Sequence, residues 1–175
     1  MNTSSLLLAL TLATAAFSAT AQTTPPAPNP LDTVAEKMPF DVPYGAPITL
    51  ERAQNAITAV VAEANKHNWK FNIAVVDSGG NLVSFVRMNG AQLASITVAE
   101  HKARAANNFR RETKVFENAI QQNSMNYVLT LDGIIASRGG IPLIENGKII
   151  GAIGCSGGSG AQDEVVCRAG VDSLK

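Results

Sequence analysis

The residues of this sequence best suited to bind a ligand lie between positions 87 and 104. Arg87 and Met88 end an apolar stretch, and His101, Lys102 and Arg104 follow in a stretch with helical spacing. Arginine and lysine form charge-assisted hydrogen bonds with carboxylates. An imidazole, and more weakly a thioether, can ligate a transition metal. These residue types predict a site for a carboxylate-bearing ligand.

The spacing of these residues predicts two walls of one pocket. Residues 87–90 form one wall, and residues 95–104 form the other after the chain turns at Asn89-Gly90. His101 and Lys102 therefore lie opposite Met88 in this prediction. The alternative is that Arg87, Lys102 and Arg104 lie on a solvated face and bind nothing.

Other catalytic chemistry has little support in the residues. The two histidines, His67 and His101, lie in neither a nucleophile elbow nor the HExxH spacing, and two isolated histidines cannot form a three-histidine zinc site. The carboxylates at positions 77, 132, 163 and 164 fit turn or helix-cap roles better than acid–base roles. The sequence therefore favours binding over a recognisable catalytic centre.

Four helical stretches and two hairpins must position the candidate site. Apolar residues recur at intervals of three and four over residues 49–68, with Thr49 as the cap, and Ser95 is expected to cap a second helix. Ser159 and Gln162 fit a capping box at the start of the last helix. Asn146-Gly147 predicts a tight hairpin turn, and Pro142 places the strand before it at a sheet edge. The expected elements are helices over 49–68, 95–109, 114–122 and 159–173, and strands over 71–76, 82–88, 141–145 and 148–155.

The first 47 residues indicate an exported protein, and the charge balance argues against a nucleic-acid or membrane partner. Fourteen basic residues balance fourteen acidic ones in 175, so no net field recruits nucleic acid or an anionic membrane. A short apolar run followed by Ala19-Thr20-Ala21 predicts a signal peptide over residues 1–21. Seven of the eight prolines lie in residues 22–47, which predicts a tether before a domain over residues 48–175. We expect a periplasmic or secreted protein without stable membrane association after cleavage.

The two cysteines are compatible with a disulfide or with two unpaired thiols. Cys155 ends an apolar strand and Cys167 lies on the helix that follows it. An oxidising compartment permits a disulfide if the two residues approach closely. The apolar surroundings favour two buried, unpaired thiols over the disulfide.

Three long motifs resemble those of a known family. The stretches VVDSGGNLVSFVRMNGA, SITVAEHKARAA and GGIPLIENGKIIGAIGCSGGSGAQD follow one another in order. They resemble the GlcG/HbpS family of small heme-binding and glycolate-locus proteins, over most of the chain from residue 48. The resemblance implies a single compact α+β domain, an antiparallel sheet backed by helices, that assembles into a homo-oligomer.

The resemblance also implies heme as the cofactor, with one departure. Ala105 stands where the family pattern has a threonine associated with the iron, and alanine cannot ligate a metal. His101 lies one helical turn earlier and is the expected metal ligand, with Met88 as a second axial candidate and Arg87, Lys102 and Arg104 as partners of the propionates. Two alternatives stay open: an enzyme acting on a small carboxylate or hydroxylated aromatic, and a non-catalytic oligomeric module that binds a protein partner.

Overall fold

The computed structural model describes residues 27 and 32–175. The chain consists of two structural units, residues 1–36 and residues 37–175. In the first unit, residues 27 and 32–36 are exposed. The expected signal peptide lies outside the described residues. The second unit contains these elements: α1 (Leu50–Lys66), β1 (Asn72–Asp77), β2 (Leu82–Arg87), α2 (Ala94–Asn108), α3 (Lys114–Gln121), η2 (Asn126–Thr130), β3 (Gly140–Glu145), β4 (Lys148–Ser156) and α4 (Gly160–Asp172).

The four strands form one antiparallel sheet in the order β2-β1-β4-β3, which confirms the α+β fold expected from the sequence. Strand β3 is an edge strand, as Pro142 predicts, because proline cannot donate a ladder hydrogen bond. The β3–β4 turn has positive φ at Asn146 (49°) and Gly147 (72°), as the two-residue hairpin turn requires.

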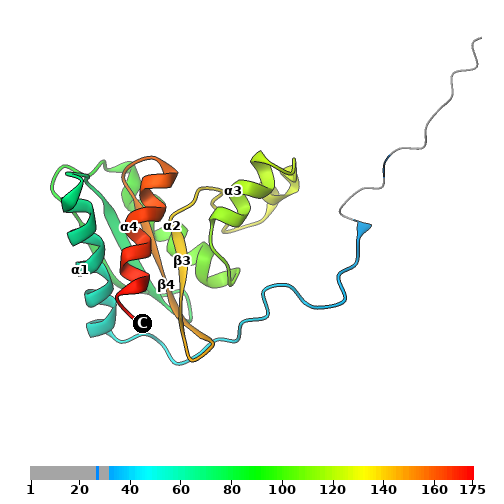
Figure 1. Ribbon diagram of the computed structural model, residues 1–175, viewed down its shortest axis with the longest axis horizontal. Helices are drawn as coiled ribbons and strands as arrows, with labels where there is room; N and C mark the ends of the chain where they lie inside the picture. The colour runs from blue at the N-terminus through cyan, green and yellow to red at the C-terminus, as the bar shows by residue number, and fades with distance from the viewer. Residues whose placement is uncertain (1–26, 28–31) are drawn as a thin grey trace, which may run out of the picture. The chain divides into compact units, whose positions relative to one another are not determined.

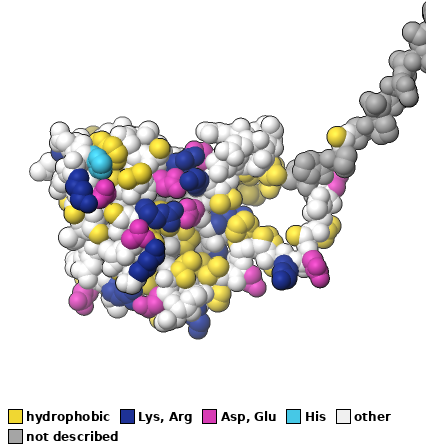
Figure 2. Space-filling view, in the orientation of Figure 1, with side chains coloured by type: hydrophobic (Ala, Val, Ile, Leu, Met, Phe, Trp, Pro, Cys, Tyr) yellow, Lys and Arg dark blue, Asp and Glu magenta, His cyan; other side chains and the backbone are white. Residues whose placement is uncertain are grey.

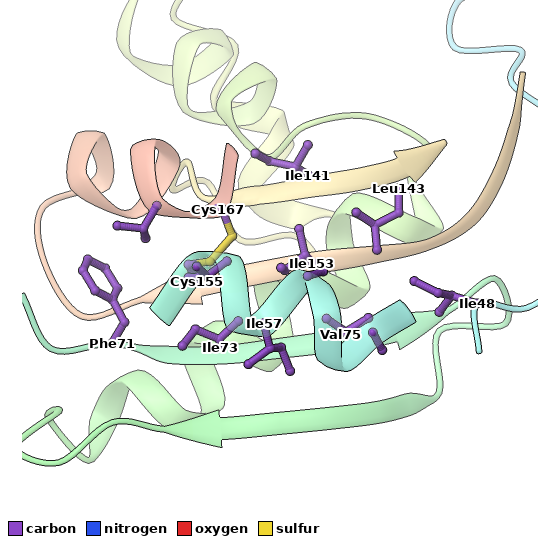
Figure 3. Packing of buried hydrophobic residues seen from close by; sticks show 14 of the residues in the cluster. Ile48, Ile57, Phe71, Ile73, Val75, Ile141, Leu143, Ile153, Cys155 and Cys167 are labelled. Atoms are coloured by element: carbon purple, nitrogen blue, oxygen red, sulfur yellow. A yellow bond between two sulfur atoms is a disulfide. The ribbon is translucent and has the colours of Figure 1, made fainter. Parts of the chain in front are cut away.

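Helices α1 and α4 lie side by side on one face of the sheet (Figure 1). Alternate residues of β1, such as Ile73 and Val75, point to this face and pack with Ile57 of α1 (Figure 3). A disulfide joins Cys155 of β4 to Cys167 of α4, with 5.6 Å between the two Cα atoms. The preference for two unpaired thiols was therefore wrong, because α4 folds back and places both residues in the same core.

Helix α2 packs on the opposite face of the sheet. Small side chains at Ala99, Ala103 and Ala106 meet Ala74 and other small residues of the strands. Gly154 of β4 allows this close approach, because a Cβ atom there would lie 2.1 Å from the carbonyl oxygen of Ala99. Close packing of backbone against backbone therefore fixes the position of α2.

Two of the helix caps are those predicted from the sequence, and a third is not. The Thr49 side chain accepts from the amide of Arg52 at the start of α1, and Ser159 forms the expected capping box with Gln162 at the start of α4. Ser95 does not cap α2. It lies inside the helix, buried, where its hydroxyl bonds to the side chains of Gln92 and Ser156.

Candidate functional site

The end of strand β2 contributes one wall of a cavity of about 380 Å³. Val86 pairs with Ile73, so its side chain faces α1, and Met88 two residues later packs against the same core. Arg87 lies between them and is exposed. The cavity therefore combines an apolar wall, a half-buried thioether and a guanidinium.

A tight turn ends this wall. The amide of Ala91 donates to the carbonyl of Met88 at 3.0 Å, and Gly90 has φ of +80°. A positive φ at the third residue of a turn is characteristic of type II, which favours glycine there. The turn leaves Asn89 exposed at the cavity mouth, where it belongs to the lining.

The opposite wall comes from α1 rather than from α2. Val61 and Asn65 of α1 line the cavity, together with Lys70 from the segment that leads into β1. The predicted second wall over residues 95–104 is therefore wrong, because α2 packs on the other face of the sheet. Lys70 is therefore a second cation in the lining, and its ammonium donates to the side-chain oxygen of Asn68 at 3.0 Å.

The structure does not bring His101 and Met88 together. His101 is exposed on α2, and Arg104 of the same helix forms a 3.0 Å ion pair with Glu100. The inner side of α2 meets the sheet face opposite to the one against which Met88 packs. Neither His101 nor Arg104 belongs to the lining of this cavity.

Lys102 and Ala105 lie within the protein. The Lys102 ammonium is 2.5 Å from Asp163 and 3.3 Å from the carbonyl of Cys155, and its side chain is 1% exposed. Burial raises the pKa of the Asp163 carboxyl, and Lys102 and the amides of two glycines act in the opposite direction. The expectation that Lys102 binds a ligand carboxylate is not supported, because its ammonium is buried and already donates to Asp163 and to the carbonyl of Cys155. Ala105 is fully buried.

Sequence reasoning missed Lys70, although the hairpin register contains the signal for it. In an antiparallel hairpin, the residues before the first strand lie beside those after the second. The amide of Met88 donates to the carbonyl of Phe71 at 2.9 Å, so Lys70 has to lie close to Met88. Val61 and Asn65 gave no such local signal.

The residues of this cavity fit a heme group chemically. Met88 supplies a soft donor suited to iron, and Lys70 and Arg87 supply cations suited to two propionates. Val61 and Val86 supply apolar contact surface for a porphyrin. No cluster of three or more His, Cys, Asp or Glu residues that could hold a bare metal ion occurs among the described residues. No helix in that part of the chain is long and apolar enough to cross a membrane.

Comparison with solved structures gives the same fold. Protein ORFY of Klebsiella pneumoniae superimposes with a TM-score of 0.70 at 30% identity, over 81% of this chain and 97% of that one. A double mutant of HbpS from Streptomyces reticuli gives a TM-score of 0.69 at 29% identity, over 82% and 97%. PduOC, solved as a heme complex, gives 0.66 at 23% identity, over 73% and 95%, and at that identity shows the fold alone.

Sequence comparison identifies the family. An uncharacterised 15.0 kDa protein of Citrobacter freundii is 37% identical over 130 residues, 73% of this chain and 92% of its own length. Protein GlcG of Escherichia coli K12 is 38% identical over 109 residues, 62% and 81% of the two chains. The family model described as haem degrading protein HbpS-like matches residues 48–172. This chain therefore belongs to the HbpS-like family.

Proposed function

We propose that this protein binds heme in the cavity between β2 and α1, with Met88 as the iron ligand. The observation that carries the proposal is the half-buried Met88 thioether in a cavity that Lys70 and Arg87 also line. The description of the family as heme-degrading and the heme complex of the structurally similar PduOC support the choice of ligand. When bound, the heme would supply the iron, and the residues named here would hold and orient it.

Each residue has a separate role in this proposal. Met88 would supply the sulfur ligand of the iron, and Val61 and Val86 would offer apolar surface to the porphyrin. Lys70 and Arg87 would pair with the propionates. His101 is the second candidate ligand, because imidazole is the stronger donor, but His101 is exposed on the outer side of α2 and does not line this cavity.

A hemin titration followed by absorption spectroscopy tests the proposal. Met88→Leu preserves the volume and removes the thioether donor, so the ligation spectrum should change while apolar contact is retained. Arg87→Gln and Lys70→Gln should each weaken hemin binding severalfold, at most about tenfold because both groups are exposed. The matched control is His101→Ala, which should leave the spectrum unchanged. A spectrum altered by His101→Ala and unaltered by Met88→Leu would assign the iron to α2.

We further propose that the protein is exported after cleavage before Gln22. The Cys155–Cys167 disulfide supports this location, since disulfides persist in oxidising compartments. Mass spectrometry of a periplasmic extract should find a chain that begins at Gln22. Recovery of the uncleaved chain in the membrane fraction would contradict export in soluble form.

We also propose a homo-oligomer. Several large apolar side chains are exposed, among them Leu93 (69%), Leu129 (65%) and Val165 (50%), and a second copy could cover them. Light scattering at micromolar concentration should report a mass well above that of one chain. A monomer at every concentration tested would rule the assembly out.

A further inference from the structure

A second cavity, of about 400 Å³, lies along the edge strand β3 and is separate from the proposed heme site. Its floor is apolar and comes from β3, β4 and the end of α4. Among the residues that the structure describes, no His, Met, Cys or Tyr belongs to its lining, so they offer none of the usual side-chain ligands of heme iron. The apolar residues of the floor and wall are Phe40, Ile141, Pro142, Leu143, Ile144, Ile150, Val171 and Leu174.

Positive charge borders this apolar floor. The lining contains four arginines and one lysine against one acidic residue, Glu112. Figure 2 shows hydrophobic side chains gathered beside α4, with Lys and Arg side chains along their border. An apolar floor with a cationic rim is complementary to a molecule that has an apolar body and an anionic end.

One of these cations differs from the rest. Among the described residues, Arg52 pairs with Glu145, Arg168 with Glu112 at 2.8 Å and Arg110 with Asp41 at 3.7 Å, whereas no ion pair includes Arg111. Arg111 is instead held in place by a backbone carbonyl and an aromatic ring. Its Nε donates to the carbonyl of Phe109 at 2.9 Å, and its guanidinium lies 3.4 Å from the ring centre of Phe40.

The Arg111 guanidinium is therefore oriented without being neutralised. Partial burial lowers its pKa, because desolvation disfavours the charged form. A carboxylate at its terminal nitrogens would offset that desolvation and form charge-assisted hydrogen bonds.

We propose that this groove binds an amphipathic monocarboxylate of the fatty-acid class, with the carboxylate on Arg111 and the hydrocarbon chain along the floor. A hydrocarbon chain suits the floor because apolar side chains of the edge strand β3, of β4 and of the end of α4 line it together. The proposal goes beyond heme binding and does not depend on it.

Fluorescence titration of the full chain with cis-parinaric acid, a fluorescent straight-chain carboxylate, tests this proposal. Binding should be saturable, and the methyl ester should bind at least about tenfold more weakly because it cannot pair with Arg111. Arg111→Gln should weaken binding about tenfold or more, and Arg111→Lys should restore most of it. Arg104→Gln, a partly exposed arginine outside the groove, is the matched control and should bind normally.

Ile144→Glu keeps the test valid if Arg111→Gln does not fold. Ile144 is 55% exposed, so the substitution leaves the core intact while placing a negative charge at the floor. It should weaken parinarate binding and leave hemin binding unchanged. Equal affinity for acid and ester, normal binding by Arg111→Gln or Ile144→Glu, or no saturable binding would each overturn the proposal.

Discussion

Removal of the Lys102 ammonium should destabilise the protein far more than its single charge would suggest. Lys102 Nζ contacts Asp163 Oδ2 and the carbonyl of Cys155, and both charged side chains are almost fully buried. Lys102→Met keeps the apolar stem and leaves the carboxylate buried without its cation. Breaking a buried pair in this way costs about 3–5 kcal/mol, and the amides of Gly157 and Gly158 that still donate to Asp163 favour the lower end.

Urea unfolding followed by circular dichroism measures this loss. The double variant Lys102→Met/Asp163→Asn should be more stable than the single variant, because it removes the isolated charge and keeps an acceptor for the glycine amides. Arg104→Met breaks the solvent-exposed pair with Glu100 and should cost at most about 1 kcal/mol. A loss below about 1 kcal/mol in Lys102→Met, or a double variant no more stable than the single one, would refute this reasoning.

The same variant should acquire a characteristic pH dependence. Burial raises the pKa of Asp163 in the native protein, and loss of the opposing Lys102 raises it further. A folded-state pKa above the unfolded value gives stability that is present below the unfolded pKa and is lost as pH rises through the folded pKa. The destabilisation of Lys102→Met relative to the native protein should therefore be smaller at acid pH than at neutral pH, and the reverse trend would contradict the assignment.

Three further substitutions test the fold by equilibrium unfolding. Cys155→Ala/Cys167→Ala removes a disulfide between residues 12 apart and should lower the free energy of unfolding by about 3 kcal/mol; an unchanged value would mean that the bond does not form. Ser159→Ala removes the N-cap of α4 and should cost about 1 kcal/mol, whereas Ser159→Asp should not. Gly154→Ala forces a Cβ atom against the carbonyl of Ala99 and should cost about 3 kcal/mol or more, so native stability would contradict the close packing of α2.

Short sequence patterns predicted the helices and strands, because a turn or a helix cap is determined by a few neighbouring residues. The Asn146-Gly147 turn, the capping box at Ser159 and the edge position of Pro142 are all confirmed. Ser95 has the residue type of a cap, yet its hydroxyl bonds to Ser156, a residue 61 positions away. A cap and a buried tertiary contact cannot be distinguished from residue type alone.

The cavities depend on which sheet face each helix covers, and this is not a local property. The sequence predicted Arg87 and Met88 in a pocket wall opposite residues 95–104, whereas the cavity that they line has α1 as its other wall, because Met88 packs toward α1. The helix that follows in sequence crosses to the other face. The groove near Arg111 was missed because its lining comes from segments far apart in the chain, from Phe40 to the end of α4. The disulfide was missed because the sequence does not show that α4 folds back onto β4 and brings the two cysteines together.

The most direct test of heme binding between β2 and α1 is a nuclear magnetic resonance spectrum of the isotopically labelled protein with and without hemin. Paramagnetic ferric iron broadens nearby amide signals, so its position can be read from the affected residues. We predict that the broadening centres on Met88, Lys70 and Asn65 and spares His101 and Arg111. Broadening centred on His101, or on Arg111 at the groove along β3, would contradict the proposed site.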